Sequence, residues 1–525
     1  MSANIAEVAP APASATDSGF DSATKFRTLV VTIIGAGLVF LDGSLVNIAL
    51  PSIQRELGIS TSMQQWVASA YLLTLSALLL VGGRLADIYG RRRVLRLGLV
   101  AYSALAALAA LAPNGATLVI ARGLQGVAGA LLVPTTLAII NAVFPPEERG
   151  KAIGTWAAWS GITTVLGPIV GGVIIDNGSW RYALLITPVL GIVTFWLSSP
   201  IPESRDESAD SRLDYVGVAL AAVSVGAIVF ALVQVPVAGW NSAGVLWSGI
   251  VGLALVPVFL LWERRVASPV LPLGMFANRN LSVANVVTLF VYAGLYGMFF
   301  YVPLYIQSSL GASATESGAV FIPITILLFF ISPYAGRLND RYGPRWLMCF
   351  GPLVAASGIV LASFTGPGQL LTVLVPGIMI FGTGLGFTVT PVTATAIGSA
   401  EQRYSGVASG FNNAVSRMAG LVAIALMGAI VIGLWQTGLS AVGFSAGPKV
   451  SAALESVADK AFVLPKTTGL TPAEATDTTA RATDAAGIAF RDGLWLAALL
   501  VATGGVVSGI WVRGGGSGGS GLRDG

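Results

Sequence analysis

The stretch Gly83-Arg84-Leu85-Ala86-Asp87-Ile88-Tyr89-Gly90-Arg91 returns 253 residues later as Gly336-Arg337-Leu338-Asn339-Asp340-Arg341-Tyr342-Gly343. Two shorter echoes follow at nearly the same offset: Glu147-Glu148-Arg149 returns as Glu401-Gln402-Arg403, and Pro134 returns as Pro391. Self-similarity at a fixed offset indicates a duplicated structural unit. The sequence therefore predicts a chain built from two related halves.

The composition places both halves in a membrane. The chain has 525 residues, of which 54% are hydrophobic and only 10% are charged. An average soluble domain carries about 25% charged residues. About twenty apolar residues span a bilayer, and the sequence contains fourteen apolar segments of about that length. Their expected bounds are 27–50, 64–84, 95–112, 116–143, 152–175, 181–199, 214–234, 244–262, 281–308, 315–335, 346–364, 369–398, 406–434 and 491–512.

The repeat pairs segments 2 to 5 with segments 10 to 13, which predicts an all-α polytopic membrane protein of two six-helix bundles. Segments 7 and 8 are an inserted hairpin. The expected parts are a disordered cytoplasmic tail at 1–24, an N-terminal bundle at 25–200, the inserted helices with their cytoplasmic linker at 201–265, a C-terminal bundle at 266–512 and a flexible tail at 513–525. Within the C-terminal bundle, residues 436–490 form an outer loop, which is either an unstructured linker or a gate with a short helix at 450–462.

The basic residues orient the helices. With the N-terminus in the cytoplasm, 20 of the 29 Lys and Arg residues face the cytoplasm and 7 face outward. Lys and Arg concentrate on the cytoplasmic loops of membrane proteins. We therefore expect a multi-pass protein of the cytoplasmic (inner) membrane with both termini inside, and we interpret the net charge of +4 as topological, with no nucleic-acid partner.

Histidine is absent and Cys349 is the single cysteine. These counts exclude His metal sites, Ser-His-Asp triads and an intrachain disulfide. No Walker nucleotide-binding sequence occurs. We therefore expect no metal, no cofactor and no enzymatic activity, and any proton chemistry falls to Asp, Glu, Tyr or a carboxylate coupled to Arg.

Two charged residues inside the first half are candidates for that chemistry. Asp42 lies roughly 12 Å and Arg122 roughly 9 Å from the outer ends of their helices, at 1.5 Å per residue. Ionisable residues inside spanning helices are functional candidates by default. We expect Asp42 and Arg122 to be coupled. The alternatives are that Asp42 reaches water at the helix end, or that a static pair only holds two helices together.

The helix face of Arg122 also carries Gln125, Gly126 and Gly129, so a neighbouring helix can approach closely there. The repeat places Leu295 and Met379 at the positions that correspond to Asp42 and Arg122. Since the charged pair occurs only in the first half, we expect this half to carry proton coupling and the second half to contribute mainly to substrate binding.

The doubled motif, the acid before Asn47 and Pro51, and the Arg122-to-Gly129 run together resemble the major facilitator superfamily, over nearly all of residues 27–512. The fourteen spans are similar to its drug:proton antiporter branch. The resemblance implies a monomeric, proton-coupled multidrug efflux transporter that exports small lipophilic or cationic compounds by alternating access. Two positions depart from the family pattern: Ser44 stands where Thr is preferred, and Ile88 where Arg is usual.

The resemblance assigns roles to two further groups of residues. The doubled motif corresponds to a cytoplasmic latch between the halves, although its basic residues also serve as ordinary positive-inside anchors; the latch residues are Gly83, Asp87, Gly90, Arg91, Arg92, Asp340 and Arg341. Segment 5 resembles the antiporter motif, although Gly and Pro are common in spanning helices anyway; its residues are Gly161, Gly167, Pro168, Gly171 and Gly172.

The expected substrate cavity combines Gln125 with the aromatic face of Tyr292, Tyr296 and Phe299. Aromatic rings attract cations, but packing or lipid contact is the commoner reason for such a face. Glu316 has capping-box spacing from Ser313, and Arg417 has no role from sequence. Export of an endogenous metabolite, lipid or siderophore remains an alternative function, as does a membrane sensor that does not transport.

Overall fold

The computed structural model describes residues 20–205, 214–267, 269, 271–399, 405–443 and 447–512, and their regular structure is helical. The first half holds α1 (Ser22–Leu57), α2 (Thr61–Tyr89), α3 (Arg91–Ala110), α4 (Gly115–Val143), α5 (Pro146–Asn177) and α6 (Trp180–Leu197). The insertion is α7 (Tyr215–Ala238) and α8 (Ala243–Glu263). The second half holds α9 (Arg279–Ser308), α10 (Ala314–Ala319), α11 (Ile322–Tyr342), α12 (Pro344–Ala362), α13 (Val375–Gly398), α14 (Ser405–Gly443), α15 (Pro448–Glu455) and α16 (Pro472–Trp511).

Each of the fourteen expected segments coincides with a helix of the described ranges. Within the part of the chain that the structure describes, twelve helices are long and apolar enough to cross a membrane, and α10 and α11 together form one of these spans, Ala314–Asn339. A thirteenth is α2, whose parts Thr61–Leu79 and Val81–Tyr89 meet at 51°. The remaining segment lies in the 32-residue helix α5, of which Leu166–Asn177 is recognised as apolar. The all-α, multi-pass architecture is confirmed.

Small polar residues begin many of the helices. The side chains of Asp21, Ser60, Asn114, Ser179, Ser242 and Asn278 accept a hydrogen bond from a backbone N–H of the first turn. Such caps satisfy the donors that a helix start leaves unpaired. Hydrogen bonds from Thr24 hold the pKa of the Asp21 carboxyl below its ordinary value. At α10 the capping box of Ser313 and Glu316 is formed as expected.

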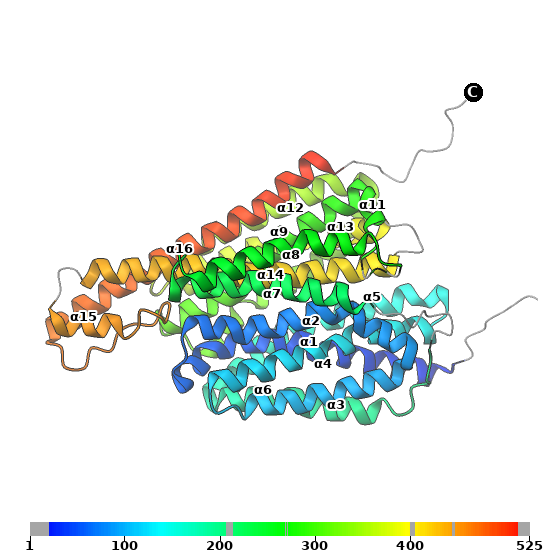
Figure 1. Cartoon of the computed structure of the whole chain (residues 1–525), viewed down its shortest axis with the longest axis horizontal. Coiled ribbons are helices and arrows are strands. Elements are labelled where there is room, and N and C mark those ends of the chain that lie inside the picture. The colour runs from blue at the N-terminus through cyan, green and yellow to red at the C-terminus, as the bar shows by residue number, and fades with distance from the viewer. Residues whose placement is uncertain are drawn as a thin grey trace, which may run out of the picture.

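Figure 1 shows the two halves as neighbouring bundles, with α1 to α6 below and most of the second half above. In the first half α2 packs on α4, and α1 packs on α5; in the second, α12 packs on α13 and α16, and α9 packs on α14. The halves touch each other through α2 and α14 and through α5 and α10. The two described chain ends lie at the same end of the molecule, opposite α15.

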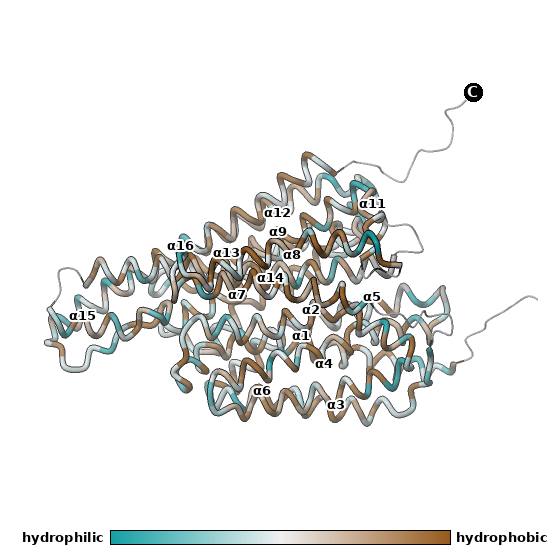
Figure 2. The backbone as a smooth tube through the Cα atoms, viewed as in Figure 1, coloured by the Kyte–Doolittle hydropathy of each residue, from teal (hydrophilic) through white to brown (hydrophobic). Residues whose placement is uncertain are grey.

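The inserted hairpin lies against the seam between the halves. α7 packs on both α2 and α14, whereas the main contact of α8 is with α7. Only 11% of the apolar window of α8 is buried inside the protein, and Figure 2 shows it brown along most of its length. An apolar helix with so little protein cover faces lipid.

Residues 436–490 are largely helical where an outer loop was expected. α14 continues to Gly443, α15 follows, and α16 begins at Pro472 with a capping box between Thr471 and Glu474. These helices project beyond the bundles at the left of Figure 1, and we call this end of the molecule the α15 end. The unstructured-linker alternative is wrong for the described part of this segment. At the N-terminus α1 begins at Ser22, inside the tail expected at 1–24, while residues 1–19 and 513–525 lie outside the described ranges.

Candidate functional site

Asp42 of α1 and Arg122 of α4 form a buried ion pair inside the first half. Arg122 Nη1 donates a hydrogen bond to Asp42 Oδ2, and the side chains of Arg122 and Asp42 are 1% and 0% exposed. The structure thus pairs the two charged residues that were expected to meet because they lie at similar depth in their helices. Because Asp42 is covered on all sides, the alternative in which it reaches water at the helix end does not apply to this conformation.

Gln125 closes the pair into a three-residue network. Its Oε1 accepts a hydrogen bond from Arg122 Nη1 at 2.7 Å, while its Nε2 donates to Asp42 Oδ1 at 3.1 Å. Gln125 is itself fully buried. Sequence reasoning placed it on the substrate cavity; in the structure its amide is used by the two charged residues.

A second layer of polar groups surrounds this network. The guanidinium of Arg122 lies 4.2 Å from the ring centroid of Tyr71, whose hydroxyl donates to Val39 O and lies 3.1 Å from the Tyr102 hydroxyl. A charge in an apolar interior is stable only when its hydrogen-bonding groups are satisfied. The network meets that demand while Asp42 is ionised and paired.

Glycines let the helices that carry the pair approach each other. A Cβ added at Gly126 would lie 2.3 Å from Tyr71 O, which fixes how closely α4 meets α2. A Cβ at Gly167 would lie 2.8 Å from Leu41 O, and one at Gly171 would lie 3.0 Å from Leu45 Cγ. Residues 167 and 171 of the segment-5 motif therefore seat α5 against the part of α1 that holds Asp42.

Two other contacts of α5 cross to the second half. A Cβ at Gly172 would lie 2.6 Å from Ala314 O, and one at Gly318 would lie 2.3 Å from Pro168 O. The Asp176 carboxylate also accepts hydrogen bonds from the backbone N–H groups of Ala314 and Thr315, at 2.9 and 2.8 Å. Gly161 belongs to α5 too, but its surroundings lie outside the side chains that the structure describes.

The expected latch residues make their described contacts within their own halves or with the linker that follows α6. Arg91 Nη2 donates to Asp87 Oδ1 at 2.8 Å, and a Cβ at Gly83 would touch Pro134. In the second half the Arg341 guanidinium lies 5.2 Å from the Tyr342 ring centroid. Asp340 lies in α11, but its side chain is outside the described ones.

Sequence reasoning missed Glu203, which organises the latch region of the first half. Its carboxylate accepts hydrogen bonds from the backbone N–H groups of Arg92 and Arg93 at the start of α3, and Arg92 Nη1 donates to Ile201 O at 3.0 Å. Gly90 has φ +103°, and a Cβ there would lie 2.8 Å from the Glu203 carboxylate. An acid at a helix N-terminus is a known signal, but Glu203 lies 111 residues away in the chain.

The three aromatic residues of α9 that were expected to line the cavity, Tyr292, Tyr296 and Phe299, are partly buried and packed against neighbours. Phe299 stacks on Phe321 with 4.5 Å between centroids. Tyr296 covers Gly420 of α14, where a Cβ would meet its ring at 2.5 Å. Tyr292 packs beside Ala419 and Ala423. Each of the three rings therefore has a packing partner in this conformation: Tyr292 and Tyr296 pack on α14, and Phe299 packs on Phe321, the residue before α11.

The halves are joined at the α15 end. Gln65 Nε2 donates to the Tyr301 hydroxyl at 3.2 Å, and Gln307 Nε2 donates to Ile48 O at 3.2 Å. Residues 456–463, which we call the bridging segment, contact both halves. Ala461 N donates to Thr61 Oγ1 at 2.7 Å, and Ser309 Oγ donates to Phe462 O at 2.6 Å. With the Asp176 contacts, these bonds close the α15 end.

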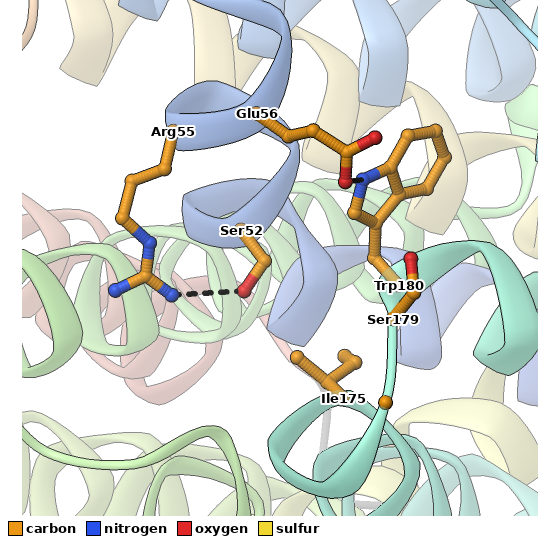
Figure 3. A pocket seen from close by; sticks show the side chains of 7 residues that line it. Ser52, Arg55, Glu56, Ile175, Ser179 and Trp180 are labelled. Atoms are coloured by element: carbon orange, nitrogen blue, oxygen red, sulfur yellow. Dashed lines mark hydrogen bonds between the residues drawn. The ribbon is translucent and has the colours of Figure 1, made fainter.

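Two small pockets lie away from the ion pair. One, of about 370 Å³, is lined by Ser52, Arg55, Glu56, Ile175, Gly178, Ser179 and Trp180. Figure 3 shows Arg55 bonded to Ser52 and the Trp180 ring nitrogen bonded to Glu56. The other, of about 410 Å³, lies beside the start of α1 and the end of α6. Neither pocket contains Asp42 or Arg122, and we assign neither a role.

Comparison with known proteins identifies the fold and the family. The family model described as Major Facilitator Superfamily matches residues 32–424. The chain belongs to the major facilitator superfamily. Among superfamily members, the puromycin resistance protein of Streptomyces alboniger is 35% identical over 77% of this chain and 81% of its own length. The multidrug resistance protein Stp of Mycobacterium tuberculosis is 32% identical over 78% and 76%, and the tetracenomycin C resistance and export protein of Streptomyces glaucescens is 29% identical over 83% and 82%.

Solved structures agree on the architecture. A bacterial homologue of the human lysosomal transporter Spinster, crystallised inward-facing and unoccupied, gives a TM-score of 0.66 at 15% identity and covers 93% of this chain and 98% of its own. The inward-open xylose transporter XylE of E. coli gives 0.59 at 12% identity, with 94% and 98% covered. At these identities the likeness concerns the fold alone.

Proposed function

We propose that this chain is a proton-coupled efflux transporter that exports small lipophilic or cationic compounds by alternating access. The observation that carries the proposal is the buried network of Asp42, Arg122 and Gln125, which is the kind of ionisable site that spanning helices hold for a function. The names of the relatives, which are resistance and export proteins, support drug export. We further propose a monomer in the cytoplasmic membrane with both termini inside.

The ion pair suggests how protons couple to the cycle. Protonation of Asp42 removes its negative charge, which releases Arg122 and Gln125 from their shared acceptor and loosens α1 from α4. A proton that moves down about 150 mV releases about 3.5 kcal/mol, enough to support a gradient of a few hundred-fold for a neutral substrate. Substrate that arrives from the cytoplasm would then displace the proton.

The contacts between the halves support alternating access. The α15 end is held by hydrogen bonds between the halves, whereas the described contacts of Asp87 and Arg91 lie within one half. With the α15 end outside, as the positive-inside bias predicts, this conformation is closed to the exterior. The latch assigned to Gly83, Asp87, Gly90, Arg91, Arg92, Asp340 and Arg341 would engage in the opposite conformation.

Dye transport in inverted membrane vesicles tests the proposal. Energised vesicles with the wild-type chain should take up ethidium, a lipophilic cation, and Asp42→Asn should abolish this uptake because Asn cannot carry a proton. Glu56→Gln is the matched control: Glu56 lies on the same helix and pairs with Arg181, but its side chain is 46% exposed. The control should keep uptake to within about two-fold, as expected of a surface site.

Each outcome is informative. Full uptake by Asp42→Asn would remove Asp42 from proton coupling, while absence of uptake by the wild-type chain with every lipophilic cation tested would contradict drug efflux. In the latter case export of an endogenous compound or a sensor role would be the functions to test.

A further inference from the structure

Arg417 of α14 is a buried cation for which the described residues supply no ion-pair partner. Its side chain is only 4% exposed, yet Nε and Nη2 have no hydrogen-bond acceptor among the described residues, and no carboxylate within them pairs with it. Arg122 is equally buried but bonds to Asp42, Gln125 and Val67 O. A guanidinium presents five N–H donors and cannot neutralise itself by losing a proton. An unsatisfied one inside a membrane protein is therefore costly to maintain.

The neighbours of Arg417 are aromatic and come from both halves. Its guanidinium carbon lies 5.3 Å from the ring centroid of Phe40 on α1. Tyr296 of α9 packs against Gly420, and Tyr292 packs against Ala419 and Ala423, all within two turns of Arg417 on α14. The Asp42 carboxylate is already hydrogen-bonded by Arg122 and Gln125. Arg417 thus adds a net positive charge at the boundary between the halves.

A purely structural role explains this arrangement poorly. A ring face attracts a cation but does not accept the several directed hydrogen bonds that a guanidinium offers in its plane. A neutral side chain of similar length would pack against Phe40 without leaving buried donors unpaired. The missing component is an acceptor that binds the planar fork of donors, and carboxylates and phosphates have that geometry.

We propose that Arg417 binds the acidic group, carboxylate or phosphate, of an amphiphilic molecule that enters between the halves, with Tyr292, Tyr296 and Phe40 around the site. The inference rests on the proposed efflux function and deepens it: the compounds carried include acids and zwitterions, not only cations. The acid is carried by a transported compound or by an anionic phospholipid, and the experiment distinguishes these sources.

The test uses the purified full-length chain in phosphatidylcholine liposomes with an imposed pH gradient. The probes are a rhodamine that bears a free carboxylate and the methyl ester of the same dye. Arg417→Gln should lower uptake of the carboxylate dye by about ten-fold or more, the usual effect of losing a hydrogen bond to a charged group, and leave the ester nearly unchanged. Arg417→Lys should be intermediate, and Arg481→Gln, on an exposed turn of α16, should match the wild type.

A second arm asks whether a phospholipid supplies the acid. Thermal unfolding is compared with and without phosphatidylglycerol for the wild type and Arg417→Gln. The site is assigned to a lipid if phosphatidylglycerol raises the unfolding temperature of the wild type but not of Arg417→Gln, while Arg417→Gln shows no selective loss of carboxylate-dye uptake. The same wild-type unfolding assay with the two dyes needs no variant: the carboxylate dye should stabilise the chain more than its ester does.

The proposal is overturned if Arg417→Gln lowers uptake of both dyes equally, since that is the mark of a structural or coupling role. It is also overturned if neither the dyes nor the lipid distinguish the variant from the wild type. If the wild type transports neither dye nor any cation, the proposed efflux function is wrong. If the wild type transports the ester, but neither the carboxylate dye nor phosphatidylglycerol gives a result that depends on Arg417, only this inference is wrong.

Discussion

Asp42 and Arg122 lie 80 residues apart in the chain, and the structure joins them through a direct bond and through Gln125. Their pairing could be predicted because two opposite charges at one depth of a membrane helix bundle have few other partners. The role of the Gln125 amide could not, since helical spacing gives the face of a residue but not the orientation of its side chain. For the same reason the sequence does not predict the aromatic side chains around Arg417.

Removing one member of the pair should destabilise the protein more than removing both. Arg122→Gln leaves the Asp42 carboxylate buried and uncompensated, which typically costs about 3–5 kcal/mol. Asp42→Asn combined with Arg122→Gln replaces the pair by neutral groups and should recover most of that loss. Thermal unfolding of the purified variants in detergent measures both effects.

Transport separates stability from coupling in these variants. The double variant should be stable but inactive in proton-driven uptake, because no group remains to carry the proton. An Arg122→Gln chain as stable as the wild type would show that Arg122 does not compensate Asp42.

The glycines of helix α5 make contacts with two different helices. Gly167 and Gly171 face α1 in the same half, whereas Gly172 meets α10 of the other half. The sequence shows only that the glycines fall at near-helical spacing. Which neighbour each one faces depends on how the two halves meet, and no local pattern encodes that arrangement.

Gly172→Ala should weaken the closure at the α15 end. The added Cβ would lie 2.6 Å from Ala314 O, so α5 and α10 must move apart. Reaction of a membrane-impermeant maleimide with Ala49→Cys, a buried position beside the Ile48–Gln307 bond, reports the opening in a chain whose Cys349 is replaced by Ser. We expect the cysteine at position 49 to be labelled several-fold faster than in the parent chain, which carries Ala49→Cys and Cys349→Ser but keeps Gly172. Such a ratio corresponds to a shift of about 1 kcal/mol in the free energy of opening.

Gly154→Ala is the control on the same helix, since a Cβ there meets nothing within 4 Å. It should leave the labelling rate unchanged. Equal rates in the parent and in Gly172→Ala would mean that the α5–α10 contact does not hold the α15 end closed.

Residues 436–490 show that hydropathy does not predict the parts of a helix that lie outside the membrane. The membrane part of α16 begins near Arg491, but its helix begins at Pro472. A helix that leaves the apolar region loses its hydrophobic signal while it keeps its backbone structure, so a polar, Ala-rich stretch resembles a linker. The Thr471–Glu474 capping box was a local signal for the helix start, although it lies twenty residues before the membrane part.

For the whole molecule, the bridging segment couples the two halves at one end. It bonds to Thr61 at the start of α2 and to Ser309 after α9. Phe462 adopts a positive φ of 68° and is fully buried, in edge contact with Tyr305. Opening of the α15 end therefore requires this segment to release one of the halves.

A disulfide between Thr61→Cys and Ala461→Cys should prevent that release. In a chain with Cys349→Ser, oxidation should stop ethidium uptake by inverted vesicles, and a reductant should restore it. Each single cysteine variant should be insensitive to oxidation. Undiminished uptake by the fully cross-linked chain would show that the bridging segment moves with both halves throughout the cycle.

The length of α16 has a practical consequence. Its 40 residues reach about 60 Å, roughly twice the hydrocarbon thickness of a bilayer. Together with α15 and the end of α14, it forms a helical projection beyond the two bundles (Figure 1). If the α15 end lies outside the cell, as proposed above, this projection offers an epitope for antibodies on intact cells. In either orientation it is an asymmetric landmark by which single particles can be aligned in electron microscopy.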